Sequence, residues 1–350
     1  MLVSDFDYSL PPQYIAQSPA SPRDHARLLH LNRADGRVAH RCFLDLPELL
    51  RPDDLLVFND TRVLRARLRG WKLNTTGPEA GRGARVEALL LCEREAGVWE
   101  ALLKPSSRLR EGTPLLFVSA DEKTRMGATA LSRTDAGWLV RFQGDLRAAL
   151  PVLGEVPLPP YIAGQSDGSD YQTVYARLTP DLESAAAPTA GLHFMPRTFE
   201  ALARRGIESA FVTLQIGVGT FRPMKAETLD DHEMHRESYA IDEKSAGKIN
   251  AQRARGGRIV AVGTTAVRVL ESAWQEGTVR PGAGATQLFI RPGHEFRAVD
   301  ALVTNFHLPR SSLLVMISAF AGVDTVRRAY EEAVAERYRF FSFGDAMFIE

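Results

Sequence analysis

Residues 258–268 read Arg-Ile-Val-Ala-Val-Gly-Thr-Thr-Ala-Val-Arg, and this stretch indicates the fold class most directly. Its apolar run predicts a strand that is buried on both faces, and the Gly263 turn predicts a helix immediately afterwards. Upstream, Asp242 can cap a helix that runs to about Arg255 and stops at the glycine pair 256–257. Helix, strand and helix therefore alternate, which is typical of an α/β domain.

The same rhythm extends in both directions from this stretch. Pro196 can open a helix that Gly206 ends, and residues 207–216 follow as a strand. Far upstream, residues 54–58 (Asp-Leu-Leu-Val-Phe) predict another strand of the parallel-sheet kind. Downstream, residues 311–338 predict two helices split by Gly322, with Asp324 as the cap of the second.

The pattern of apolar and polar residues changes between about residue 65 and residue 150. Short alternating runs at 85–91, 98–103, 115–118 and 137–142 are separated by Gly, Pro and charged turns, which predicts a small all-β module of the barrel kind. A chain of 350 residues also exceeds what one core usually supports. We therefore expect a larger α/β domain, formed by residues 1–64 and 152–350, with an inserted barrel-like domain of residues 65–151.

The composition limits the possible partners and compartments. Cys42 and Cys92 are too far apart for a CxxC motif, which disfavours a disulfide framework and favours a reducing cytosol. The acidic, proline-broken start does not resemble a targeting peptide, and the apolar stretch 313–321 is too short to cross a bilayer. We therefore expect a cytoplasmic protein that does not use a membrane.

Charge gives only a local signal for nucleic acid. The chain has 43 basic and 43 acidic residues, so any contact with RNA must come from a cluster. Arg65, Arg67 and Arg69 alternate on one predicted strand face and could follow a phosphate backbone. A solvated strand edge whose charges prevent unwanted strand pairing is the competing explanation, and for this pattern alone it is the better one.

Two turns before predicted helices are candidates for ligand binding. The Gly263-Thr264-Thr265 turn offers free backbone N–H groups to an anion, and Arg268 could add a bidentate grip on a carboxylate. A capped helix with a surface arginine is the alternative. The second turn, at residues 188–194, gathers Thr189, Gly191 and His193.

Two further segments end predicted strands with polar or small residues. Residues 213–221 contain Gly217 and Gly219 but lack the third glycine and the helix of a dinucleotide motif, which disfavours NAD. These glycines could let the backbone approach a nucleoside closely, although a β-bulge is equally compatible. Residues 302–309 place Asn305 and His307 at a turn.

The histidines and carboxylates of residues 231–237 do not have the spacing of a zinc site. His235 and Glu237 are two positions apart, which on a strand would place both side chains on one face, as an acid/base residue with an orienting partner requires. Residues 338–347 mix aromatic rings with Arg339 and Asp345. Such rings can stack on a base, but burial in the core is commoner.

Taken together, the motifs resemble one family, the S-adenosylmethionine:tRNA ribosyltransferase-isomerases of queuosine biosynthesis. The resemblance spans nearly the whole chain outside the β module, and one departure is Gln215, where the family usually has His. The matching segments are DFDYSLPPQYIAQSPASPRDHARLL (5–29), LLVFNDTRVLRARL (55–68), PTAGLHF (188–194), VTLQIGVGTF (212–221), EMHRESY (233–239), VGTTAVRVLES (262–272), LFIRPGHEFRAVDALVTNFHLPRSSLLVMISAFAG (288–322) and YRFFSFGDAMFI (338–349).

The resemblance implies a transferase that moves and isomerises the ribosyl unit of S-adenosylmethionine onto 7-aminomethyl-7-deazaguanine at the wobble position of a tRNA. Epoxyqueuosine-tRNA, adenine and methionine are the implied products, with S-adenosylmethionine as co-substrate, no other cofactor, no metal and a monomeric enzyme. Within the matching motifs we expect catalytic roles for His193, His235, His307 and Asp345, and donor binding by Thr189, Gly191, Gly217, Gly219, Thr220, Thr264, Thr265, Arg268 and Asn305.

Two rival functions predict different sequences. An S-adenosylmethionine methyltransferase acting on RNA should have a glycine-rich loop after its first strand and an acidic residue at the end of its second, and that layout is missing. A non-catalytic RNA-binding protein should be strongly basic, whereas this chain has a formal net charge of +0. Both rivals are therefore disfavoured.

Overall fold

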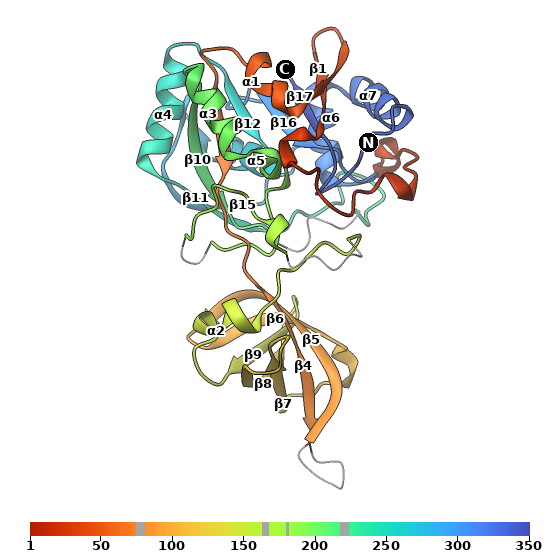
Figure 1. The fold of residues 1–350 in the computed structure, drawn as a ribbon, viewed down its shortest axis with the longest axis vertical. Coiled ribbons are helices and arrows are strands. Elements are labelled where there is room, and N and C mark those ends of the chain that lie inside the picture. Colours follow the sequence, from red (N-terminus) through yellow and green to blue (C-terminus); the bar gives the residue numbers. More distant parts are fainter. Residues whose placement is uncertain (75–80, 163–167, 180–181, 218–223) are drawn as a thin grey trace. The chain divides into compact units, whose positions relative to one another are not determined.

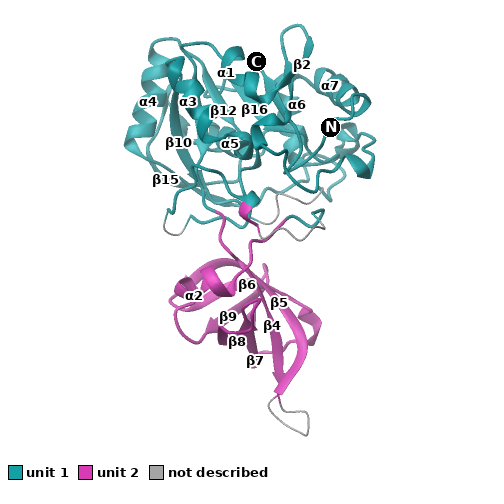
Figure 2. Ribbon diagram, in the orientation of Figure 1, with its two compact units in different colours: residues 1–62, 159–165, 170–350 teal, residues 63–158, 166–169 magenta. Residues whose placement is uncertain are grey.

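The computed structural model describes residues 1–74, 81–162, 168–179, 182–217 and 224–350. The chain separates into two compact units, coloured differently in Figure 2. The larger comprises Met1–Arg62, Pro159–Gln165 and Asp170–Glu350, and the smaller comprises Val63–Leu158 and Ser166–Ser169. The described part of the chain contains no helix with the length and apolarity that a membrane crossing requires.

The larger unit is built on a mixed sheet (Figure 1), which in the described residues has nine strands in the order β15-β11-β10-β3-β12-β16-β17-β1-β2. Strands β10, β3, β12 and β16 run parallel to one another, and β17 is antiparallel to β16. The strands are β1 (Arg27–Leu31), β2 (Val38–Cys42), β3 (Leu55–Asn59), β10 (Glu208–Leu214), β11 (Glu237–Ile241), β12 (Ile259–Val262), β15 (Gly282–Thr286), β16 (Ala301–Asn305) and β17 (Ala346–Ile349).

Apolar clusters cover both faces of this sheet. Leu55 and Val57 of β3 belong to one cluster, and Leu56 and Phe58 of the same strand belong to another, as the two-residue repeat of a strand requires. The helices are α1 (Leu46–Leu49), α3 (Pro196–Arg204), α4 (Glu243–Ala254), α5 (Thr264–Ala273), α6 (Ser312–Ala321) and α7 (Val323–Ala335).

Short elements complete the larger unit. A two-stranded ribbon joins β13 (Trp274–Gln275) to β14 (Thr278–Val279). The 3-10 helices are η1 (Val3–Phe6), η2 (Pro12–Tyr14), η3 (Arg23–His25), η4 (Phe43–Asp45), η7 (Thr189–His193) and η6 (Ser169–Tyr171), whose first residue belongs to the smaller unit.

The smaller unit is a closed antiparallel barrel in the order β4-β5-β6-β9-β8-β7. At its base the two connecting segments pair, because the amide of Arg67 donates to the carbonyl of Glu155 (3.0 Å) and the amide of Glu155 donates back (2.8 Å). The elements are β4 (Arg67–Asn74), β5 (Gly81–Glu95), β6 (Val98–Lys104), β7 (Thr113–Val118), β8 (Arg125–Arg133), β9 (Trp138–Phe142), α2 (Leu146–Leu153) and η5 (Ser106–Arg108).

The predicted fold class, a larger α/β domain with a small barrel-like domain, is confirmed. Asp242 caps α4 as expected, since its carboxylate accepts a hydrogen bond from the amide of Ser245 at 2.6 Å. The expected cap of the last helix is wrong, because Gly322, with φ of 88°, occupies the N-cap of α7 and Asp324 lies in its first turn. A backbone with that φ is strained for any side chain with a Cβ, so glycine takes the position.

Candidate functional site

A pocket lies in the larger unit where loops follow the parallel strands β10, β12 and β16. Carboxyl ends of parallel strands share one edge of a sheet, so their turns converge there. Five of the predicted site residues, Thr189, Thr264, Thr265, Asn305 and His307, line this pocket. The other lining residues are Ala187, Pro188, Ala190, Ile216, Gly263, Thr304 and Leu313.

The N-terminus of α5 forms one wall of the pocket. Gly263 precedes the helix with φ of 88°, its amide donates to the carbonyl of Val303 at 2.8 Å, and no side chain caps the helix. The amides of the first turn are therefore left for solvent or a ligand, and they carry the positive end of the helix dipole. The buried hydroxyl of Thr265 has no hydrogen-bond partner in the described part of the chain.

Asn305 and His193 form a buried pair at the end of β16. The Asn305 amide nitrogen lies 3.2 Å from Nε2 of His193 and 3.1 Å from the carbonyl oxygen of Phe341. His193 stacks on Phe43 with ring centroids 5.0 Å apart, and burial lowers its pKa to about 4. At neutral pH the ring is therefore uncharged, which lets Nε2 accept a hydrogen bond from Asn305.

His307 is also buried and uncharged at neutral pH, because burial lowers its pKa to about 3. Its Nε2 lies 3.3 Å from the hydroxyl of Thr304. Within the described residues, the Nδ1 of His307 and the Oδ1 of Asn305 have no hydrogen-bond partner, like the hydroxyl of Thr265. Unsatisfied buried polar atoms cost about 1–3 kcal/mol each, so a pocket lined by several of them favours a polar ligand.

Arg268 lies on α5 but does not line the pocket. Its buried guanidinium forms an ion pair with Glu237 and donates from Nε to the carbonyl of Leu288 at 3.3 Å. The second oxygen of Glu237 accepts a hydrogen bond from the amide of Gly217 at 3.2 Å. The pair thus ties the segment that follows β10 to helix α5.

Two further predicted site residues, Asp345 and His235, lie outside the lining of the pocket. Asp345 is buried and accepts hydrogen bonds from the amides of Arg27 (3.0 Å) and Arg339 (2.8 Å). His235 is exposed and precedes β11, which begins at Glu237, so the prediction that both share a strand face is wrong. The strand starts only where pairing with β15 begins. Gly219 and Thr220 lie outside the described residues.

Gly191 has a packing role behind the pocket. A Cβ at this position would lie 1.8 Å from the hydroxyl oxygen of Tyr175 and 3.1 Å from Cγ2 of Thr173. The loop η7 can therefore pack against Tyr175 only with glycine at 191. Sequence reasoning did not single out Tyr175, which precedes Gly191 by sixteen positions and lies in no recognised motif.

Two tyrosines that sequence reasoning also missed hold the backbone of His307. The hydroxyl of Tyr8 donates to the carbonyl of His307 at 2.5 Å, and the amide of His307 donates to the hydroxyl of Tyr330 at 2.9 Å. Tyr8 belongs to the quoted motif of residues 5–29, which was the only available signal. Among the described residues no group of three or more His, Cys, Asp or Glu side chains is arranged to hold a metal ion.

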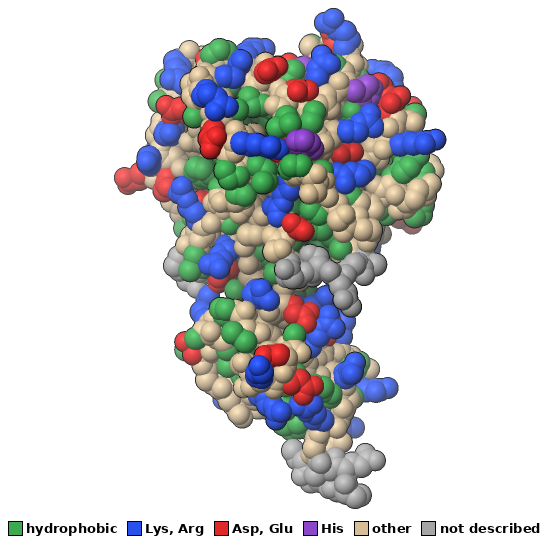
Figure 3. Space-filling model, viewed as in Figure 1, with side chains coloured by type: hydrophobic (Ala, Val, Ile, Leu, Met, Phe, Trp, Pro, Cys, Tyr) green, Lys and Arg blue, Asp and Glu red, His purple; other side chains and the backbone are tan. Residues whose placement is uncertain are grey.

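The arginine stripe that was a candidate for contact with RNA has its partners within the smaller unit. Arg67 pairs with Glu87 (3.4 Å), Arg69 pairs with Glu155 (3.0 Å), and Arg65 precedes β4 and donates to a backbone carbonyl. The face shown in Figure 3 likewise intersperses Lys and Arg with Asp and Glu. These contacts favour the explanation that the charges protect a strand edge from unwanted pairing.

Other cations gather at the end of the barrel where β4, β6 and β8 end. Lys72 donates to the carbonyl of Arg108 (3.4 Å), and Arg133 donates to that of Ser106 (3.3 Å), so these side chains share one rim. No carboxylate of the described ranges forms an ion pair with the cations of this rim, which are Lys72, Lys104, Arg108, Arg110 and Arg133.

Comparison with known proteins gives a consistent result. A family model described as queuosine biosynthesis protein matches residues 3–349. Proteins named S-adenosylmethionine:tRNA ribosyltransferase-isomerase are similar over their full lengths: that of Symbiobacterium thermophilum is 51% identical (100% of both chains), and that of Thermus thermophilus 50% (98% of both). A crystal structure of S-adenosylmethionine tRNA ribosyltransferase from Thermotoga maritima is 38% identical, with a TM-score of 0.57, and covers 99% of this chain and 100% of that one.

Proposed function

Since this chain belongs to the family of queuosine biosynthesis proteins, we propose that it is an S-adenosylmethionine:tRNA ribosyltransferase-isomerase. It transfers and isomerises the ribosyl unit of S-adenosylmethionine onto 7-aminomethyl-7-deazaguanine at the wobble position of tRNA. Adenine and methionine leave, and the tRNA carries epoxyqueuosine. S-adenosylmethionine is thus a co-substrate that is consumed.

The observation that carries this proposal within the structure is the convergence of three strand-end turns on one pocket with unsatisfied polar atoms. The positive sulfonium of the donor acidifies the protons on the adjacent 5′ carbon and makes methionine a neutral leaving group. The enzyme therefore needs a base, an acid for the departing adenine, and accurate positioning.

We assign the proton transfers to His307 and His193. Both rings are uncharged at neutral pH, which is the form that a base requires, but Nε2 of His193 already accepts a hydrogen bond from Asn305. His307 is the better placed of the two, because it lines the pocket and its Nδ1 has no partner within the described ranges. Asn305, which contacts His193, fixes the orientation of that ring.

We assign the methionine carboxylate of the donor to the start of α5. The uncapped first turn, with Thr264 and Thr265 in the pocket lining, suits an anion. The Arg268–Glu237 pair supports this wall from behind by holding the amide of Gly217, next to Ile216 of the lining. Arg268 thus acts on donor binding through the loop it anchors.

For the tRNA, we assign the phosphate contacts to the cationic rim of the barrel, Lys72, Lys104, Arg108, Arg110 and Arg133. A cation that is already paired with a carboxylate gains less binding free energy from a phosphate than an unpaired cation. An unpaired cation displaces the counterions that surround the phosphate. We also propose that the working unit is a monomer, and a tRNA substrate suits the cytosol.

The proposal is tested by incubating the protein with S-adenosylmethionine and tRNA that carries 7-aminomethyl-7-deazaguanine. We expect free adenine together with a mass gain of the tRNA, and loss of both in His307→Ala. The matched control is His40→Ala, which removes an exposed histidine of the edge strand β2 and should remain active. Formation of S-adenosylhomocysteine in place of adenine would show a methyltransferase instead.

A further inference from the structure

The backbone of His307 is held from both sides by phenols, that of Tyr330 buried and that of Tyr8 half-buried. Tyr8 donates to its carbonyl oxygen at 2.5 Å and Tyr330 accepts from its amide at 2.9 Å, whereas within the described ranges the ring has one hydrogen-bond partner, the hydroxyl of Thr304 at 3.3 Å. The main chain of this residue is therefore fixed more firmly than its ring. Nδ1 of that ring has no partner among the described residues and belongs to a side chain that lines the pocket.

The two phenols are themselves fixed by aromatic packing. The rings of Tyr8 and Tyr330 meet edge to face, with centroids 5.1 Å apart, and Tyr330 meets Phe306 in the same way at 5.3 Å. Edge-to-face pairs of buried rings restrict the positions that their hydroxyl groups can take. Burial also raises the pKa of both tyrosines, so the Tyr8 hydroxyl keeps its proton, and with it the hydrogen bond, throughout an ordinary assay range.

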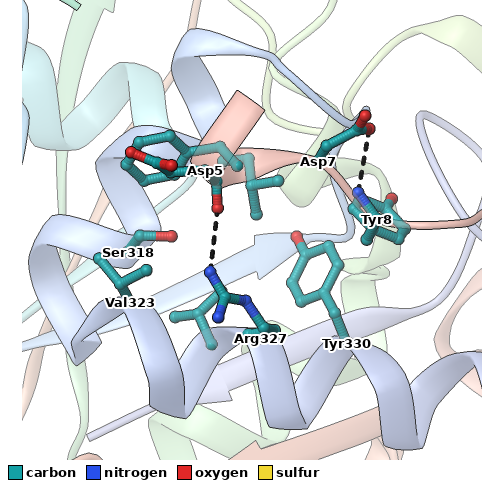
Figure 4. Close-up of a pocket in the computed structure, with 10 residues that line it drawn as sticks. Asp5, Asp7, Tyr8, Ser318, Val323, Arg327 and Tyr330 are labelled. Carbon is teal, nitrogen blue, oxygen red and sulfur yellow. Dashed lines mark hydrogen bonds between the residues drawn. The ribbon is translucent and has the colours of Figure 1, made fainter. Parts of the chain in front are cut away.

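Tyr8 is carried by an N-terminal segment, residues 1–8, that is attached to the same turn. Arg310 binds this segment twice, through an ion pair with Asp7 and through its amide, which donates to the carbonyl of Phe6 at 2.9 Å. On the other side, Arg327 of α7 donates to the carbonyl of Asp5 at 3.2 Å, as Figure 4 shows beside a small hollow. The segment thus braces the turn that carries His307 against α7.

We propose that Tyr8 and Tyr330 are positioning residues that set the place of the His307 imidazole in the pocket, an inference that rests on the proton-transfer role given to His307 above. Proton transfer requires donor and acceptor atoms within hydrogen-bond reach, and a displacement of 1 Å can reduce a rate by about 100-fold. A clamp on both backbone groups limits such displacement. The two tyrosines do not themselves contact the reacting atoms.

The test uses the full-length enzyme with Tyr8→Phe and Tyr330→Phe, each of which keeps the ring and removes one hydroxyl. We expect kcat for adenine release to fall about 10-fold to 100-fold in each variant, with KM for S-adenosylmethionine changed less than about two-fold. The control is Tyr338→Phe, which deletes the hydrogen bond of a buried tyrosine to His40 (2.8 Å) and should leave kcat unchanged.

A second variant addresses the possibility that the tyrosine substitutions unfold the protein. Asp7→Asn breaks the ion pair with Arg310 at a partly exposed position, where such a pair contributes little to stability. We expect a normal Tm and a smaller loss of kcat, again without a change of KM.

The outcomes separate the two levels of the argument. If His307→Ala is inactive while both Phe variants and Asp7→Asn keep the kcat of the wild type, the positioning role is refuted and the proposed function stands. If His307→Ala retains full turnover, the assignment of proton transfer to this residue fails, and the inference fails with it. A fall in kcat for the two Phe variants but not for Tyr338→Phe supports the inference.

Discussion

Replacing Gly191 by alanine should damage the pocket through a single steric contact. The added Cβ would lie 1.8 Å from the hydroxyl oxygen of Tyr175 and 2.9 Å from its Cζ, well inside van der Waals contact. The ring of Tyr175 cannot retreat easily, because Phe58, Phe199 and Phe211 surround it at centroid distances of 5.0, 5.7 and 5.9 Å. Overpacking of this kind costs about 1–3 kcal/mol of unfolding free energy.

The strain should be partly relieved by a second substitution. Tyr175→Phe removes the atom of closest approach, and that hydroxyl is buried without a hydrogen-bond partner in the described residues. Its removal alone should therefore be neutral or stabilising by up to about 1 kcal/mol. In the double variant, Cζ of residue 175 still lies close to the added Cβ, so only part of the strain is relieved. We expect a coupling energy of about 1 kcal/mol, which makes the double variant more stable than the sum of the two single effects predicts.

The assay is a double-mutant cycle of urea unfolding, accompanied by measurement of adenine release. Gly191→Ala should lower turnover as well as stability, because the displaced loop η7 carries Thr189 of the pocket and His193. The reasoning is refuted if Gly191→Ala is as stable as the wild type, or if its loss of stability is the same with Phe at position 175.

Further predictions concern stability, pH and RNA. Arg258→Gln should cost about 3 kcal/mol in urea unfolding, because it leaves Asp54, whose side chain is 0% exposed, without its ion pair; a loss below about 1 kcal/mol would contradict this. The pKa of His193 is lowered from 6.5 to about 4 in the folded protein, so the unfolded chain takes up the proton first as the pH falls. The free energy of unfolding therefore decreases between pH 6.5 and about pH 4. His193→Gln should reduce this pH dependence by up to about 1.4 kcal/mol per pH unit, measured by urea unfolding. Arg108→Glu should raise KM for tRNA and reduce the dependence of tRNA affinity on salt (the slope of log K against log salt concentration) by about 1. Arg69→Glu, at an arginine already paired with Glu155, should change both quantities less. Equal effects would show that Arg69 contacts RNA as closely as Arg108 does.

The sequence predicts the elements of the larger unit well where the signal is local. The cap at Asp242, the buried strand of residues 259–262 and the turn at Gly263 all depend on neighbours within a few positions, and the structure has them where they were expected. Convergence of several turns also follows from a local rule, since strand ends of a parallel sheet share one edge. This rule explains why five of the predicted site residues lie together in the pocket lining, but it does not explain why Arg268, His235 and Asp345 lie outside it.

Contacts between distant segments were not accessible in the same way. The ion pair that occupies Arg268 joins residues 31 positions apart, and the hydrogen bond between Tyr8 and His307 joins residues 299 positions apart. Sequence patterns show that an arginine is present but not which carboxylate satisfies it. The same reason explains why the sequence left contact with RNA open for the arginines at 67 and 69, which the structure pairs with glutamates.

The paired segments at the base of the barrel have a consequence for how the chain reaches its fold. Strands β3 and β10 are neighbours in the sheet, yet the whole barrel separates them along the chain. Once the barrel has formed, the ladder between Arg67 and Glu155 brings its two ends together, so the loop that must close to join β3 to β10 consists only of residues 60–66 and 156–207, and its entropic cost is lower. A barrel that forms early would thus speed assembly of the sheet, and substitutions that weaken the barrel would slow the folding of a unit to which they do not belong.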